Sequence, residues 1–204
     1  HPPEGDWRTW VVMGGRGAFK DLAKIMRLSG QLPSDFMTMV SVEGALANAG
    51  VIGFVTWGYV LLVGGPFNGP VLGGLFTIIG FATFGKHAKN GLPVLAGVVL
   101  ATLLFGKGLT TPGPLLAALF ALTLAPLAGE FGWPIGVVAG MIHLAIVEQT
   151  GSWHMGVNLY NNGFAGGLTA TALVSIIEWY TSARNQVSFG ENSRLGKRRT
   201  GRRT

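Results

Sequence analysis

The sequence contains no cysteine, which excludes disulfide bonds, thiolate chemistry and cysteine-ligated metal sites. Charge is also scarce, because only 12% of the 204 residues are Asp, Glu, Lys or Arg, against about 25% in soluble domains. Hydrophobic residues make up 49% and the mean hydropathy is +0.44, so there are too few polar groups to cover a surface that faces water. The composition predicts an integral membrane protein, in which many of the 33 glycines serve close helix packing.

Arginine is absent between Leu28 and Ala183, where the only lysines are Lys86, Lys89 and Lys107. Basic residues instead flank this apolar region on both sides: Arg8, Arg16, Lys20, Lys24 and Arg27 before it, and Arg184, Arg194, Lys197, Arg198, Arg199, Arg202 and Arg203 after it. Because basic flanks mark the cytoplasmic side, both termini are predicted to be cytoplasmic, with an even number of crossings between them. Attraction to anionic lipid explains the basic tail, so no specific nucleic-acid partner is predicted.

The chain divides into a cytoplasmic lead at 1–35, a membrane domain at 36–182 and a basic cytoplasmic tail at 183–204. Within the lead, apolar residues alternate with lysines at helical spacing over 18–28. This pattern is typical of an amphipathic helix on the membrane surface, and an ordinary solvated helix is the alternative. The sequence lacks an initiator Met, so we expect the chain to be processed or to be part of a longer protein.

The membrane domain contains six apolar segments. They run near 36–63, 70–85, 91–106, 114–129, 133–148 and 163–182, and Asp35 is a candidate N-cap for the first. Several have only about 14 to 16 residues, and a helix of about 15 residues covers about 22 Å of a hydrocarbon core near 30 Å. The sequence therefore predicts an all-α polytopic bundle with short or broken helices, and re-entrant segments are one way to build it.

Two stretches of the chain match each other closely. Residues 67–75 read FNGPVLGGL and residues 160–168 read YNNGFAGGL, each with an aromatic residue, Asn and a later Gly-Gly-Leu. Asn can cap a helix start and the glycine pair lets another backbone approach, so the motif predicts helix ends that face a cavity. The plain alternative is a turn followed by a packing face. The candidate solute-binding residues are Asn68, Gly69, Gly73, Gly74, Asn161, Asn162, Gly163, Gly166 and Gly167.

Ionisable groups inside membrane segments are functional candidates by default. Glu130 lies between Pro126 and Pro134, where the helix should break, and His143 lies among Val, Ala, Ile and Leu. We add both to the candidate site; a loop position for Glu130 and a structural hydrogen bond for His143 are the alternatives. No known hydrolase motif or metal-ligand spacing occurs, so no enzyme activity, cofactor or metal is predicted.

Three longer stretches carry a resemblance to a known family: FNGPVLGGLFTIIGFATFGKHAKNGLPVLAGV, LTLAPLAGEFGW and NLYNNGFAGGL. Together they resemble an uncharacterised bacterial multi-pass membrane family known only as a domain of unknown function, over about residues 30–182. The resemblance implies a bacterial cytoplasmic (inner) membrane protein. Members of that family look about twice as long, with two related halves, and this chain resembles the C-terminal half. A second half or a second copy is therefore the expected partner.

A weaker similarity is to urea transporters, whose repeats carry an aromatic-Asn-Gly stretch at the start of helices beside a narrow pore. Asn68–Gly69 and Asn162–Gly163 match that element. Our leading hypothesis is a membrane channel or transporter for a small polar solute, with a pathway lined by the Asn-initiated helix ends. The rival is a structural or assembly subunit without transport of its own. An intramembrane enzyme would require Glu130 and His143 to converge.

Overall fold

The structure is a computed structural model that describes residues 16–31, 35–155 and 158–200. Every regular element in these residues is a helix, and no strand forms among them. The all-α fold predicted from the sequence is therefore confirmed. The start of the lead, at 1–15, and the end of the basic tail, at 201–204, lie outside the described residues.

The lead contains helix α1 (Arg16–Ile25), close to the amphipathic helix predicted over 18–28. Ile25 is fully buried against the protein, whereas Phe19 is 75% exposed. The helix packs on α3 (Val42–Leu62). The apolar side of α1 is thus partly buried against the bundle, and Phe19 remains exposed and able to contact lipid.

The first apolar segment, predicted over 36–63, is divided in two. The single helical turn α2 (Phe36–Met39) has Val40 as its C-cap, and the long helix α3 follows. Asp35 caps α2 by accepting a hydrogen bond from the Met37 backbone N–H at 3.0 Å. The hydroxyl of Ser41 caps α3 in the same way, so two successive capping residues explain the break.

Helices α4 (Gly69–Phe81) and α5 (Ala88–Leu104) are short, as predicted for segments 70–85 and 91–106. At 1.5 Å per residue they measure about 20 Å and about 26 Å, less than a hydrocarbon core of about 30 Å. The connecting turn between them carries Gly85 with a φ of 66°, a conformation that glycine adopts without strain.

The fourth apolar segment, predicted over 114–129, is a broken helix. It consists of α6 (Pro112–Phe120), a 3₁₀ turn η1 (Ala121–Leu124) and α7 (Ala125–Phe131). Pro126 lies at the start of α7, where it lacks an N–H to continue the hydrogen bonds of α6. The prediction of short or broken helices is confirmed here most directly.

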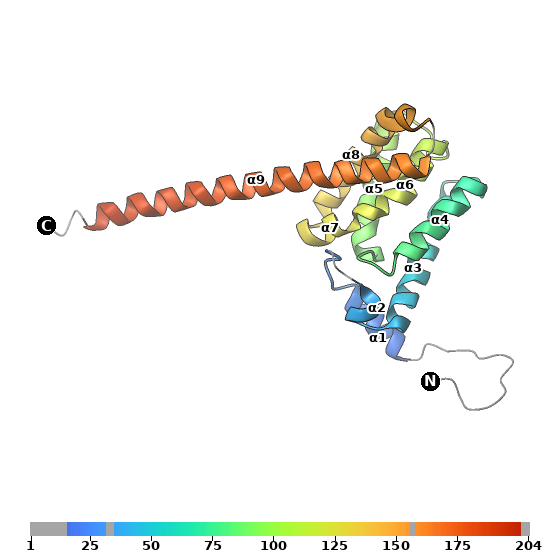
Figure 1. Cartoon of the computed structure of the whole chain (residues 1–204), viewed down its shortest axis with the longest axis horizontal. Helices are drawn as coiled ribbons and strands as arrows, with labels where there is room; N and C mark the ends of the chain where they lie inside the picture. The colour runs from blue at the N-terminus through green and yellow to red at the C-terminus, as the bar shows by residue number, and fades with distance from the viewer. Residues whose placement is uncertain (1–15, 32–34, 156–157, 201–204) are drawn as a thin grey trace.

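Gly132, with a φ of 93°, turns the chain into α8 (Trp133–Thr150), which matches the segment predicted over 133–148. A short 3₁₀ turn, η2 (Gly151–His154), follows α8. The last helix, α9 (Asn158–Thr200), is far longer than the predicted 163–182. In Figure 1 it runs obliquely past α8 and continues well beyond the rest of the bundle.

Three stretches of the described chain are long and apolar enough to cross a membrane: 42–62, 112–131 and 133–153. Helices α4 and α5 are apolar but shorter. Large apolar side chains face outward on these helices, including Phe54 (75% exposed) and Phe76 (71% exposed). An exposed apolar surface of this kind is satisfied by lipid rather than water, so the bundle is embedded in a membrane.

The centre of the bundle is the pair α5 and α8, which pack more extensively than any other two elements among the described residues. Two glycines permit this contact. A Cβ atom on Gly97 would overlap the carbonyl of Val137, and one on Gly140 would overlap the carbonyl of Val94. Backbone therefore touches backbone in both directions, which is how small residues drive helix association in membranes.

The bundle has two distinct ends (Figure 1). The lead end carries α1, α2, the turn between α4 and α5, and the Gly132 turn; there Gly129 abuts the backbone of Ser29 so closely that a Cβ would not fit. The far end carries the turn between α3 and α4, the loop between α5 and α6, and η2. At this far end Lys107 and Glu148 form an ion pair of 2.6 Å.

Candidate functional site

Four buried polar residues join α8 to α9 and form what we call the polar seam: His143 and Thr150 on α8, and Asn161 and Asn162 on α9. His143 Nε2 lies 3.2 Å from Asn162 Oδ1. The Thr150 hydroxyl donates to Asn161 Oδ1 at 2.6 Å, and Asn161 Nδ2 donates to the Val147 carbonyl at 2.8 Å. Each of these four residues is at most 3% exposed, so the polar seam is enclosed by protein.

The sequence of α9 explains why its polar residues face α8. Over 160–184, where the structure describes the burial of α9, the buried residues recur at helical spacing: Asn161, Asn162, Ala165, Gly166, Thr169 and Leu173. This spacing defines one face of a helix. The glycines predicted as site residues between them, Gly163 and Gly167, point away from the seam and are exposed.

The break in the fourth apolar segment lies against the polar seam. A Cβ on Gly166 would lie 3.4 Å from Thr123 Oγ1 in η1 and 4.0 Å from His143 Cε1. Gly166 therefore lets η1, α8 and α9 meet at one point. The Thr123 hydroxyl donates to the Phe120 carbonyl at 2.8 Å, so its hydrogen bond stays within the same turn of the chain.

His143 has one ring nitrogen that is used and one that is not. Because Asn162 Oδ1 only accepts hydrogen bonds, His143 Nε2 is the donor and Nδ1 is the remaining acceptor. His143 is fully buried, and its Nδ1 has no hydrogen-bond partner among the described residues. Buried polar atoms are nearly always paired in native proteins, so His143 Nδ1 is a candidate contact for a solute or a water; Asn48 Oδ1 in α3 is the other buried side-chain atom without a partner among the described residues.

The other predicted site residues do not join the polar seam. Asn68 is exposed at the far end and caps α4 by accepting from the Val71 N–H at 3.2 Å. Gly69 and Gly73 are also exposed, and Gly74 is buried against Leu119 and Phe120 rather than against α9.

The two matching stretches therefore differ in structure. Asn68 stands at a helix start as predicted, but Asn161 and Asn162 lie inside α9, which begins at Asn158. The prediction that these two residues initiate a helix is wrong. Their amides bond to α8 instead, and this partner on another helix replaces the local capping role that the sequence motif suggested.

Glu130 lies at the end of α7, where it is exposed near the Gly132 turn. His143 lies about ten residues into α8, which places it about 15 Å along the helix from that turn. The two residues therefore do not form a common centre. No group of three or more His, Asp or Glu side chains in the described part of the chain is arranged to hold a metal ion.

The sequence reasoning missed a second buried polar cluster at the lead end. Asn90 Nδ2 donates to the carbonyls of Ser29 (3.2 Å) and Gly85 (2.9 Å), and His87 Nε2 bonds to the Leu28 carbonyl at 2.9 Å. The pKa of His87 is below its usual value, because burial disfavours the charged imidazole. The bond to the Leu28 carbonyl offsets only part of this effect. The sequence feature that could have revealed this cluster is the spacing His-x-x-Asn. Its two side chains form a reciprocal capping box at the start of α5.

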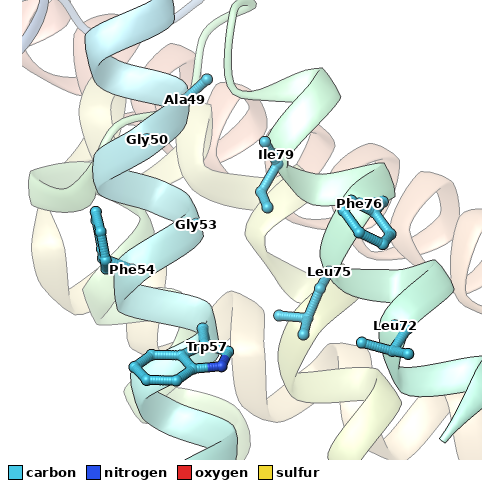
Figure 2. Close-up of a pocket in the computed structure, with 9 residues that line it drawn as sticks. All are labelled: Ala49, Gly50, Gly53, Phe54, Trp57, Leu72, Leu75, Phe76 and Ile79. Carbon is cyan, nitrogen blue, oxygen red and sulfur yellow. The ribbon is translucent and has the colours of Figure 1, made fainter. Parts of the chain in front are cut away.

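An apolar groove of about 360 Å³ separates α3 from α4. In Figure 2, Leu75 and Ile79 of α4 point toward the α3 segment that carries Gly50 and Gly53. The lining is entirely of apolar residues apart from Trp57, so it offers almost no hydrogen bonds to a polar solute. The polar seam is therefore the better candidate site.

These observations define the class: a membrane-embedded all-α bundle with short and broken helices and a buried polar seam. The comparison with family models matches residues 15–179 to "Protein of unknown function (DUF1576)", and the chain belongs to that family. The resemblance to an uncharacterised family inferred from the sequence is confirmed. Comparisons with curated proteins and with solved structures each gave no match.

Proposed function

We propose that the chain is a membrane channel or transporter that passes a small polar solute along the polar seam between α8 and α9. The observation that supports this most is the orphan Nδ1 of His143, deep inside a helix that is long and apolar enough to span the bilayer. Polar groups are expensive in such a place, and they persist there when function requires them.

The helix break beside the polar seam supports the same proposal. Transporters commonly place their binding sites where discontinuous helices meet near the middle of the membrane. Here η1 interrupts the segment 112–131 at 121–124, and Gly166 brings this interruption next to His143. A change in the break would alter the space around the imidazole directly, which is how a gate could act on the seam.

The chemistry of the polar seam favours an uncharged solute. Its groups are an imidazole, two carboxamides and a hydroxyl, all of which can exchange hydrogen bonds with a neutral amide or alcohol. The nearest acidic residue in sequence, Glu148, is paired with Lys107 at 2.6 Å. Neutral donors and acceptors can replace the water molecules that hydrate a polar solute. They bind the solute less tightly than a fixed charge would, so the solute can leave again.

The proposal includes an orientation and a partner. We place the lead end in the cytoplasm of a bacterial cell, with α9 as the last of an even number of crossings, because basic residues gather at both ends of the chain. The residues of the polar seam are at most 3% exposed, so a single copy of the chain leaves little open space around them. A second copy or a second related half is therefore proposed to complete the pathway.

The test is solute flux in proteoliposomes, measured by stopped-flow light scattering with urea and glycerol as probes. His143→Gln and Asn162→Ala should each lower the wild-type flux about fivefold to tenfold, as expected for the loss of one buried hydrogen bond from the pathway. Asn68→Ala is the matched control, because its amide only caps an exposed helix start. Equal flux in the wild type and both seam variants would reject the proposed pathway.

One observation favours the structural or assembly role as a second candidate. The Asn161 amide is bonded at both its oxygen and its nitrogen within the chain, which is the arrangement expected of a packing residue. Under this role the wild-type chain conducts neither probe. Asn161→Ala would then lower the stability of the folded chain, as measured by thermal unfolding in detergent, because it removes two bonds between α8 and α9.

A further inference from the structure

A pocket of about 390 Å³ opens at the lead end of the bundle, away from the polar seam. Its walls come from four places in the sequence: the residues after α1 (26–29), the start of α5, the end of α7 and the start of α8. The pocket is hollowed where these four chain segments meet. It is therefore a feature of the tertiary fold rather than of one loop.

Two cationic side chains, Arg27 and Lys89, line this pocket, and no Asp or Glu does. Neither cation forms a side-chain ion pair or hydrogen bond with any described residue. Two other lysines of the described chain are neutralised: Lys24 pairs with Asp21 at 2.8 Å, and Lys107 pairs with Glu148. Two unpaired positive charges on one concave surface attract an anion.

The wall between the two cations is held in place by hydrogen bonds. His87 and Asn90 line the pocket, yet their side chains are bonded to the backbone of Leu28, Ser29 and Gly85, which fixes the lead against α5. On the opposite wall, α8 begins at Trp133 without a side-chain cap. Its first N–H groups add to the positive potential that the two cations create.

We propose that this pocket binds a phosphate group through Arg27 and Lys89. Arg presents a planar fork of donors that matches phosphate oxygens, and Lys adds a point charge. The remaining lining, which includes Met26, Pro93 and the 69%-exposed Trp133, is largely apolar. An anionic phospholipid headgroup with its chains against these residues fits both parts, and free inorganic phosphate shares the same recognition chemistry.

The test uses the full-length chain in detergent and native mass spectrometry. Phosphatidylglycerol is compared with phosphatidylcholine of the same acyl chains, and inorganic phosphate is titrated separately by thermal unfolding. The pocket variant is Arg27→Gln with Lys89→Gln. The matched control is Lys20→Gln with Lys24→Gln, which removes the same charge from the exposed side of α1, outside the pocket.

The pocket variant should bind phosphatidylglycerol about tenfold to a hundredfold more weakly than the wild type, as expected from the loss of one or two charged hydrogen bonds. The control variant should retain its affinity. A second result would identify a soluble phosphate as the ligand. In that case inorganic phosphate stabilises the wild type but not the pocket variant, and phosphatidylglycerol binds neither protein in preference to phosphatidylcholine. Equal losses in both variants, or no loss in the pocket variant, would overturn the proposal.

Discussion

Single buried amides hold this protein together at the places where its helices are interrupted. Asn48, in the first half of α3, is fully buried, and its Nδ2 donates to the carbonyls of Ala82 (2.7 Å) and Lys86 (2.6 Å). Those carbonyls belong to the turn between α4 and α5, so they have no helical partner. One side chain thus supplies hydrogen bonds to two carbonyls of this turn.

We expect Asn48→Ala to destabilise the protein by about 2–3 kcal/mol, because it leaves buried carbonyls without a donor. The measurement is unfolding of the detergent-solubilised chain by denaturant titration. Thr77→Ala is a suitable control, since the Thr77 hydroxyl bonds only to the Gly73 carbonyl of its own helix at 2.7 Å. A loss no larger than that of the control would contradict the role assigned to Asn48.

Lys86 is buried with no acidic partner among the described residues, and burial lowers its pKa to about 8. Its ammonium lies 4.8 Å from the centre of the Phe81 ring. Because the pKa is lower in the folded chain than in the unfolded one, the charged lysine penalises folding below pH 8. The penalty disappears as the pH rises from 8 toward 10.5.

Lys86→Met should therefore raise stability at pH 7 by up to about 3 kcal/mol, the equivalent of the pKa difference. At pH 10 the advantage should shrink to less than about 1 kcal/mol, because the lysine of the folded wild type is then neutral and that of the unfolded chain is close to its own pKa. Melting temperatures of both proteins at the two pH values check this. An advantage of the same size at both pH values would rule out ionisation as its cause.

At the scale of elements, glycine determines which helices meet. Gly97 and Gly140 allow α5 and α8 to touch through their backbones, whereas a Cβ atom added to Gly73 on α4 would meet nothing within 4 Å. The same residue type therefore has two roles in the chain. Only the contacts of a glycine, and not its presence in an apolar run, separate a packing site from an open surface.

Gly97→Ala should destabilise the bundle by about 1–3 kcal/mol, because its methyl group would overlap the Val137 carbonyl and push α5 from α8. Gly73→Ala should be neutral or stabilising by up to about 1 kcal/mol, since alanine is the better helix former. Thermal unfolding of the two variants in the same detergent provides the comparison. If both variants lose equal stability, the close contact of α5 and α8 is not what holds the pair.

Most elements of the fold could be predicted from the sequence, because apolar runs and capping residues are local signals. Asn68 at the start of α4 and Pro126 at the helix break both behave as their local chemistry predicts. The polar seam could not be predicted in full. The bond between His143 and Asn162 joins residues on different helices, and only tertiary packing decides that Asn162 faces α8 while Asn68 faces outward.

At the scale of the whole molecule, the two ends of the bundle differ in the basic residues that they carry. Arg27, Lys86 and Lys89 lie at the lead end, while Lys107 at the far end is neutralised by Glu148. This asymmetry is the pattern that orients membrane proteins. The proposed orientation, with the lead end in the cytoplasm, is therefore supported by charges that the folded chain gathers at one end.

The absence of cysteine makes this orientation testable with single introduced thiols. Gly108→Cys, exposed at the far end, should react with a membrane-impermeant maleimide added to intact cells. Glu130→Cys, exposed at the lead end, and Ser182→Cys, exposed just past the middle of α9, should react only after the membrane is opened. Labelling of Ser182→Cys in intact cells would show that α9 does not return to the cytoplasm.

The contacts of the lead also set an order for assembly during synthesis. The Leu28 carbonyl bonds to His87, which is synthesised 59 residues later. The Ser29 carbonyl bonds to Asn90, which is synthesised 61 residues later. At ribosomal rates of about 5–20 residues per second, that interval is about 3–12 s. The end of the lead therefore stays without these bonds until the start of α5 has been made, and the polar seam, which needs Asn161 and Asn162, can form only after that.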